Sequence, residues 1–276
     1  SGWGAKLGRN ADYAGTNGYL HALDFSHNVV HDIMADGILG GEPISNAVIC
    51  DNEIYNIATD GAGARPTDGD HGLYWQGPGA VICDNYVHDV YDGVTSGNGG
   101  LGISYRTNVT VTRNIVCDIM AKDGIAYWSD HAGSGTSEIS NNVVYNCARH
   151  AFCLAGALGS NNPNRYEIDR HNIYHNTFYH TATNADWTQV APVKWYDLSQ
   201  PCSIYFTGNI IALDNGDSAD HYIVDGASAP TTIIPYNTWP GQEGQVYINQ
   251  NIKTPLNYTL SSMFMDYANR DFHLKA

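Results

Sequence analysis

Basic side chains are rare in this sequence, and three of them fall at matching places in successive segments. The chain has 13 Lys and Arg residues against 28 Asp and Glu residues. Arg106, Lys122 and Arg149 nevertheless lie at or just before three consecutive short apolar runs. A Lys, Arg or His side chain can take a proton from carbon when neighbouring cations lower its pKa. This concentration of cations therefore indicates a catalytic site.

Two histidines and an aspartate accompany the cations. His71, Asp123 and His150 each stand directly before an apolar run of the same kind. Together with Lys122 and Arg149 they form the predicted catalytic set. The structural alternative is that these are loop residues that satisfy turns and one another, and the sequence leaves that alternative open.

Three aspartates near these segments are predicted calcium ligands. Asp68 and Asp70 lie just before His71, and Asp92 follows the next apolar segment. Carboxylate oxygens are the ligands that Ca²⁺ takes in proteins. No other cofactor is indicated.

A repeat must position all of these residues. The string AVICDNEIYNI at 47–57 returns as AVICDNYVHDV at 80–90. Aligning the chain on the Asn of this string gives eight copies, spaced by 24 to 34 residues. The anchors are Asn28, Asn52, Asn85, Asn114, Asn142, Asn176, Asn209 and Asn237.

The copies predict the coils of a solenoid. Positions three before, two after and five after the anchor are apolar almost without exception, and the residues between alternate as in strands. Four residues after the anchor lies a second polar column, which begins with Asp32 and Asn56. We expect both polar columns to be tight bends, because Asn and Asp tolerate left-handed backbone angles. A unit of about 30 residues of this kind is one coil.

A further strand per coil follows the bends and begins near a Gly. The segments are DGILGG at 36–41, HGLYWQ at 71–76, LGISYR at 101–106, DGIAYWS at 123–129 and HAFCLA at 150–155. Their alignment predicts an inward column of Ile38, Leu73, Ile103, Ile125 and Phe152. The neighbouring outward column is Leu39, Tyr74, Ser104, Ala126 and Cys153.

Through these columns, residues 20–240 resemble the right-handed parallel β-helix family of pectate-lyase-like proteins. The ending MFMDYANRDFHLKA at 263–276 also resembles the closing segment of secreted bacterial members. The resemblance implies an all-β single domain over 1–276, with about eight coils at about 20–240, a loop-built groove and an irregular C-terminal cap at about 241–276. The usual N-terminal capping segment is missing ahead of the first coil.

The resemblance implies a secreted, extracellular or cell-surface protein that cleaves an extended polysaccharide. Tyr74, Tyr127 and Trp128 would stack on sugar rings, and Arg106 would bind the same chain. On a uronan, removal of the proton beside the carboxylate drives β-elimination, and Ca²⁺ would neutralise the uronate. We favour a lyase slightly over a hydrolase.

A glycoside hydrolase is the second enzymatic option. Retaining enzymes place two carboxyl groups about 5 Å apart, and inverting enzymes about 6.5–9.5 Å. Stacked coils hold equivalent side chains about 5 Å apart on neighbours and about 10 Å apart on alternate coils. Asp92 with Asp123, or Asp70 with Asp123, would then form the pair.

The rival class is a non-catalytic structural or glycan-binding subunit, because this fold also serves in tailspikes and adhesins. An open strand edge at the first coil is a template for another chain, so end-to-end self-association is expected in that case. The formal net charge of −15 argues against nucleic acid and anionic membranes as partners. No apolar run is long enough to span a membrane.

Two further columns have structural explanations. Cys50 and Cys83 share one column, with Cα atoms expected about 4.8 Å apart, which is within disulfide range. Their parallel side chains favour stacked free thiols over a bridge. His31, Tyr55 and His88 are expected to stack as a ladder rather than to bind metal.

Overall fold

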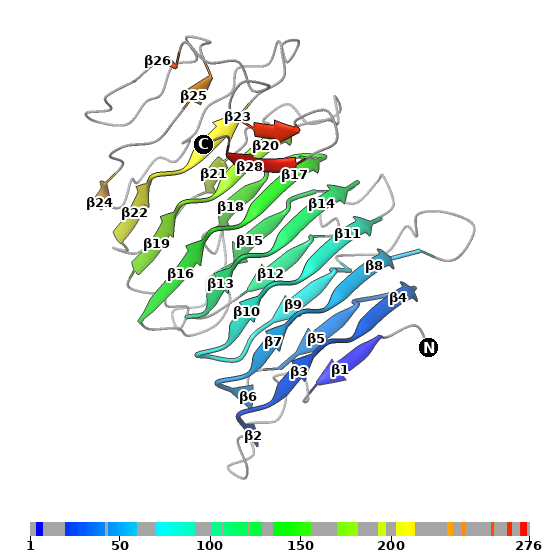
Figure 1. The fold of residues 1–276 in the computed structure, drawn as a ribbon. Coiled ribbons are helices and arrows are strands. Elements are labelled where there is room, and N and C mark those ends of the chain that lie inside the picture. Colours follow the sequence, from blue (N-terminus) through cyan, green and yellow to red (C-terminus); the bar gives the residue numbers. More distant parts are fainter. Residues whose placement is uncertain are drawn as a thin grey trace.

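Short parallel strands stack in chain order to form a β-solenoid, a parallel β-helix (Figure 1). The computed structural model describes residues 4–7, 20–41, 44–59, 70–91, 101–105, 108–120, 122–128, 135–155, 170–181, 193–196, 203–212, 231–233, 239–240, 255–256, 264–266 and 271–274. These residues form strands, turns and bends without a helix, so none of them forms a helix able to cross a membrane.

Three long parallel sheets make up the solenoid. Sheet I contains β1 (Ala5–Leu7), β5 (Ile38–Gly40), β9 (Leu73–Trp75), β12 (Ile103–Tyr105), β15 (Ile125–Trp128), β18 (Phe152–Ala155) and β21 (Val193–Tyr196). Sheet II contains β3 (Asp24–Ser26), β7 (Val48–Cys50), β10 (Val81–Cys83), β13 (Thr110–Thr112), β16 (Thr136–Ser140), β19 (Arg170–Tyr174), β22 (Ser203–Thr207) and β24 (Thr231–Ile233). Sheet III contains β4 (Val29–Ile33), β8 (Glu53–Ile57), β11 (Tyr86–Val90), β14 (Ile115–Ile119), β17 (Val143–Cys147), β20 (Thr177–Thr181) and β23 (Ile210–Ala212).

Three short sheets complete the described strands. The pairs are β2 (Leu20–His21) with β6 (Ile44–Ser45), β25 (Trp239–Pro240) with β26 (Pro255–Leu256), and the antiparallel β27 (Phe264–Asp266) with β28 (Asp271–Leu274). The predicted C-terminal cap at 241–276 and the loops of the predicted groove lie mostly outside the described residues.

The repeat places equivalent residues in register, as predicted. Ile82 pairs with Ile49 in sheet II, and Val87 pairs with Ile54 in sheet III, so 47–57 and 80–90 occupy the same edge of adjacent coils. The apolar columns are buried in one continuous core that fills the space between the three sheets. Burial of branched apolar side chains at every coil is what stabilises such a stack.

The anchor asparagines have a different role from the predicted one. They form a buried ladder: the Nδ2 of Asn85 donates to Oδ1 of Asn114 at 2.9 Å, and the Asn114 amide donates to Asn142 at 3.0 Å. The residue before each anchor makes the bend instead, as at Asp84 and Arg113 with φ of 54° and 56°. The second polar column does bend, from Asp32 (φ 55°) through Asn146 (φ 51°), as predicted.

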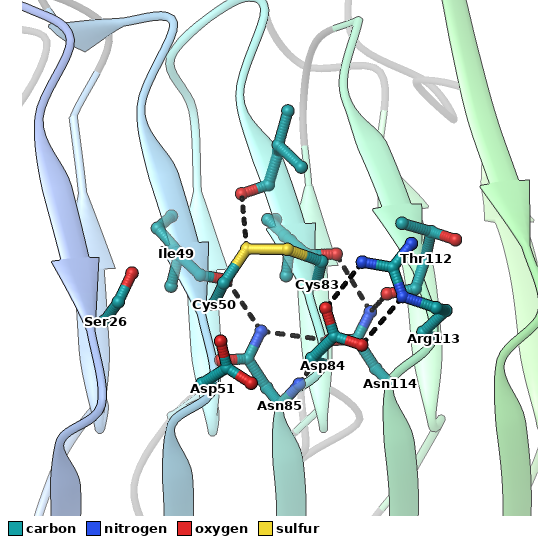
Figure 2. Close-up of a disulfide and its surroundings, with 12 residues drawn as sticks. Ser26, Ile49, Cys50, Asp51, Cys83, Asp84, Asn85, Thr112, Arg113 and Asn114 are labelled. Atoms are coloured by element: carbon teal, nitrogen blue, oxygen red, sulfur yellow. Dashed lines mark hydrogen bonds and ion pairs between the residues drawn. A yellow bond between two sulfur atoms is a disulfide. The ribbon is translucent and has the colours of Figure 1, made fainter.

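The expectation of free thiols at Cys50 and Cys83 is wrong. A disulfide joins them across β7 and β10, with their Cα atoms 4.6 Å apart. Figure 2 shows the Cys50–Cys83 bridge with its two neighbours in the same column. Ser26 of β3 lies next to Cys50, and Thr112 of β13 lies next to Cys83. The Cα spacing of adjacent parallel strands falls within the range that a disulfide spans.

The ring ladder of sheet III follows the prediction. The rings of His31 and Tyr55 stack with centroids 5.1 Å apart, and those of Tyr55 and His88 with centroids 5.2 Å apart. No group of three His, Cys, Asp or Glu residues among the described residues is placed to hold a metal ion.

Candidate functional site

A column of mostly ionisable residues runs along the corner where the strands of sheet I begin. We call it the corner column: Asp36, His71, Leu101, Asp123 and His150. The residue after each member donates its amide to the carbonyl of the next member, for example Gly72 to Leu101 at 2.9 Å and Gly102 to Asp123 at 3.0 Å. Successive members are therefore neighbours on adjacent coils.

Glycine next to the corner column is required by close packing. A Cβ atom on Gly102 would lie 2.5 Å from Cγ1 of Val116 and 2.6 Å from the carbonyl oxygen of Gly124. Gly72 and Gly124 are equally confined. The tight corner brings the column close to the core and fixes the direction of its side chains.

Asp123 and Arg149 form a buried ion pair within the column. Arg149 Nε donates to Oδ1 of Asp123 at 2.8 Å, and Nη2 donates to Oδ2 at 2.5 Å. The exposed fractions are 0% for Asp123 and 7% for Arg149. Burial raises the pKa of the Asp123 carboxyl, but the charges of Arg149 and His150 outweigh it and hold that pKa below its ordinary value. Asp123 is therefore a carboxylate at neutral pH.

Two lysines lie on the coils on either side of the one that carries Arg149. Lys122 is 3% exposed, and Lys194 of β21 is 4% exposed. Burial and then the charge of Asp123 hold the pKa of the Cys153 thiol above its ordinary value. Arg149, Lys122 and Lys194 lower the pKa of the same thiol, and Lys194 is the register partner of Cys153. The loops before β15 and β18 and the strand β21 thus bring three cations to consecutive coils.

The other half of the corner column is slightly more open to solvent. The side chains of His71 and Asp36 are 12% and 10% exposed, against 9% for Arg149 and 0% for Asp123. The ring of His71 stacks on Tyr74 of β9 with centroids 4.8 Å apart, and the Tyr74 hydroxyl accepts a hydrogen bond from Gln76 at 2.7 Å. Leu101 separates this open half from the buried half at Asp123.

The structure thus brings together most of the predicted catalytic set. Asp123 binds Arg149, and the backbone amide of Arg149 donates to the carbonyl of Lys122 at 2.8 Å. His150 is the neighbour of Asp123 on the next coil, and His71 lies two coils from Asp123 in the same column. Parallel strand spacing puts His71 and Asp123 about 10 Å apart. Tyr74 is in the predicted outward position beside His71.

The substrate-binding role predicted for Tyr127 is wrong. Tyr127 is buried in the core, in register with Tyr105, and its ring meets the edge of His171 from sheet II with centroids 4.7 Å apart. The alternation that directs Ile125 inward directs Tyr127 inward as well.

Several predicted residues lie outside the described part of the chain. These are Arg106, Asp68 and Asp92, and also the side chain of Trp128, whose backbone belongs to β15. Asp70 is described and lies at the start of the corner. The calcium site therefore stays a prediction.

Two residues of the site were absent from the predicted set. Lys194 continues the outward column because β21 pairs with β18 and sets Lys194 beside Cys153. The signal was the apolar residue Val193, which falls in the inward column opposite Phe152. Asp36 belongs to the candidate site because its carboxylate contacts the ring of His71. The two residues are 35 positions apart in the sequence, so only the three-dimensional structure reveals this contact.

Comparisons with known proteins add little at the level of the site. The sequence matches no protein-family model, and it matches no curated protein. Among solved structures, the A-module of the mannuronan C-5 epimerase AlgE6 of Azotobacter vinelandii is similar, with 12% identity and a TM-score of 0.45 over 88% of this chain. The match covers 65% of that module's chain, which is less than two thirds of its length.

Proposed function

We propose that this chain is a secreted carbohydrate-active enzyme that cleaves a uronate-bearing polysaccharide by β-elimination. The supporting observation is the mixed composition of the corner column. A structural ladder repeats one residue type, as the buried Asn residues do in coil after coil. The corner column instead alternates acids, imidazoles and an apolar residue beside three cations. Ionisable groups with specific partners concentrate at functional sites.

The cations favour an anionic substrate. A protein of net charge −15 repels a polyanion unless a local group of cations attracts it. Lys122, Arg149 and Lys194 come from three consecutive coils and supply such a group. Binding a uronate carboxylate there would make the neighbouring C–H more acidic, which is the requirement for elimination.

The state of Asp123 favours a lyase over a hydrolase. A hydrolase needs a carboxyl group with a raised pKa to protonate the leaving oxygen. Asp123 has a lowered pKa and both of its oxygens bind Arg149, so it suits the role of holding the guanidinium in place. Arg149 in turn supplies positive charge at the site rather than a base for proton abstraction.

Secretion and calcium belong to the same proposal. The Cys50–Cys83 disulfide supports an oxidising compartment, where such bonds persist. If Asp68, Asp70 and Asp92 hold Ca²⁺ against the uronate, a chelator lowers the rate of cleavage and added Ca²⁺ restores it.

A panel of neutral and uronate-bearing polysaccharides tests the proposal, with new reducing ends as the readout. We expect cleavage of a uronan, and Lys194→Ala should reduce kcat/KM by about 10- to 100-fold, the effect of losing a hydrogen bond to a charged group. Lys6→Ala is the matched control, because Lys6 lies on β1 in the same sheet and its register partner Leu39 belongs to the same outward column. Equal losses in both variants would contradict the assigned site.

One observation favours the rival structural role. In the described part of the chain, β1, β3 and β4 are edge strands at the same end of the three long sheets. Their unpaired edges are templates on which a second copy of the chain could add strands. Sedimentation over a range of protein concentrations distinguishes the two roles. Growing assemblies without cleavage of any polysaccharide would support the structural role.

A further inference from the structure

Ser104 of β12 carries a buried hydroxyl that has no hydrogen-bond partner within the described part of the chain. The residue is 0% exposed. A buried hydroxyl without a partner costs free energy, because it has given up its hydrogen bonds to water. Few buried polar groups stay unpaired in folded proteins, and a bound molecule is one source of the missing partner.

The side chain of Ser104 faces away from the core. Its neighbours in the strand, Ile103 and Tyr105, both belong to the buried core cluster, and successive side chains of a strand point to opposite faces. Ser104 therefore lies in the outward column of sheet I. Its register partners in that column are Tyr74 of β9 and Ala126 of β15.

Small side chains continue the outward column from Ser104 towards the cations. We call Ser104, Ala126 and Cys153 the small-residue floor, because they are register neighbours on β12, β15 and β18. Lys194 of β21 follows Cys153 in the same column. The floor residues are 0% exposed and Lys194 is 4% exposed, so the floor and this cation are equally sheltered from solvent. An extended chain that binds at Lys194 and runs along the stack therefore passes over the floor and reaches Ser104.

The spacing of the strands separates two contacts on such a chain. Adjacent parallel strands lie about 4.8 Å apart, so the three strand spacings from Ser104 to Lys194 amount to about 14 Å. This distance is longer than one sugar ring. A carboxylate bound at Lys194 and a group bound by Ser104 therefore belong to different sugar units of one chain.

We propose that Ser104 is a substrate-binding residue that pairs with a hydroxyl of a sugar unit next to the bound uronate. This inference rests on the proposed function, which places the uronate at the cations. The Ser104 hydroxyl can both donate and accept a hydrogen bond, as a sugar hydroxyl can. The small side chains of Ala126 and Cys153 let the sugar ring lie close to the sheet. A chain without the matching hydroxyl binds less well, because Ser104 then stays unpaired.

Urea unfolding without substrate tests whether the hydroxyl is unpaired in the free protein. Ser104→Ala removes a buried polar group that has no partner to lose, so its urea midpoint should equal or exceed that of the wild type. The matched control is Ser140→Ala on sheet II. Ser140 is also buried, but its hydroxyl lies 3.1 Å from Oγ1 of Thr112, so this variant should unfold at lower urea. An equal loss in Ser104→Ala would overturn the inference whatever the protein binds.

Kinetics on the uronan that the wild type cleaves test the contact itself. Ser104→Ala should raise KM by about 3- to 10-fold, the effect of losing one hydrogen bond between neutral groups, with kcat changed less than about twofold. Ser140→Ala should keep the wild-type KM. An unchanged KM in Ser104→Ala would overturn the inference.

Electrophoresis in gels that contain each polysaccharide of the panel separates this inference from the proposed function. If the wild type cleaves no uronan, the proposed function fails. Ser104→Ala should even then bind the polysaccharide that retards the wild type about 3- to 10-fold more weakly. Equal retardation of the two proteins, or no retardation of the wild type by any polysaccharide, would overturn the inference.

Discussion

His171 is a buried imidazole with a single polar partner among the described residues. Its Nδ1 lies 2.8 Å from the hydroxyl of Ser137 on the adjacent strand, and its Nε2 has no hydrogen-bond partner in that part of the chain. Burial lowers the pKa of His171 to about 3. The folded protein therefore holds this ring neutral over a pH range in which the unfolded chain protonates it.

This burial makes the stability of the fold sensitive to acid. Because the unfolded chain binds a proton below about pH 6.5 and the folded protein does not until about pH 3, the free energy of unfolding falls as pH drops through this window. The loss contributed by His171 is about 1.4 kcal/mol per pH unit. His171→Asn should remove most of this slope in urea unfolding between pH 6 and 4. The control His31→Gln, at an exposed histidine, should keep it. An unchanged slope in His171→Asn would contradict the assignment.

At the scale of the element, the asparagine ladder holds sheet II to sheet III. Asn114 donates to the carbonyl of Ile82 and to Asn142, and accepts from the amide of Asn85. Each ladder side chain thus satisfies buried backbone groups at the corner between the two sheets, which would otherwise be unpaired.

Removal of one rung from the middle of the ladder should be costly. Asn114→Ala leaves several buried groups without partners and should lower the free energy of unfolding by about 3–5 kcal/mol. Asn28→Ala is the comparison, because Asn28 is half-buried at the end of the ladder and accepts from no described Asn. Equal losses in urea unfolding would contradict the cooperative ladder.

The disulfide joins two coils that are already hydrogen-bonded. It closes a sequence separation of 33 residues, and loop-closure entropy gives it about 3–4 kcal/mol of stabilisation. Replacing both Cys50 and Cys83 by Ser should lower the free energy of unfolding by this amount in denaturant titrations without reducing agent. The double variant should become insensitive to added dithiothreitol. A wild type that is equally insensitive to dithiothreitol would contradict the bridge.

The strand columns were predictable because alternation and register both follow from local sequence. The strings at 47–57 and 80–90 and the inward column of Ile103 and Ile125 needed no partner information. The bends at the anchors were assigned one residue too late, since anchor Asn side chains bind the next coil rather than their own turn. That role depends on stacking, which a single repeat does not reveal.

The site was predictable in its residue types and only partly in its contacts. Cations next to successive corners identified Lys122 and Arg149 from spacing alone. Sequence spacing could not reveal that Asp123 binds Arg149 through both oxygens, or that Asp36 is the partner of His71. Tyr127 was misplaced because its aromatic character was weighed above its position in the alternation.

For the whole molecule, the proposal combines an acidic protein with a local group of cations. The net charge of −15 disfavours most contacts with a polyanion, so a uronan would bind where Lys122, Arg149 and Lys194 gather. His71 lies in the corner column about 10 Å from Asp123, two coils along the same stack. The long axis of the solenoid suits the binding of an extended polysaccharide chain.

The central claim is elimination on a uronan, and one time course tests it most directly. The ultraviolet absorbance of new double bonds and the appearance of reducing ends are followed together on the same sample. The account predicts that both rise with one double bond for each new chain end, and that both fall together in Lys194→Ala. Reducing ends without double bonds, or no cleavage of any uronan in the panel, would contradict it.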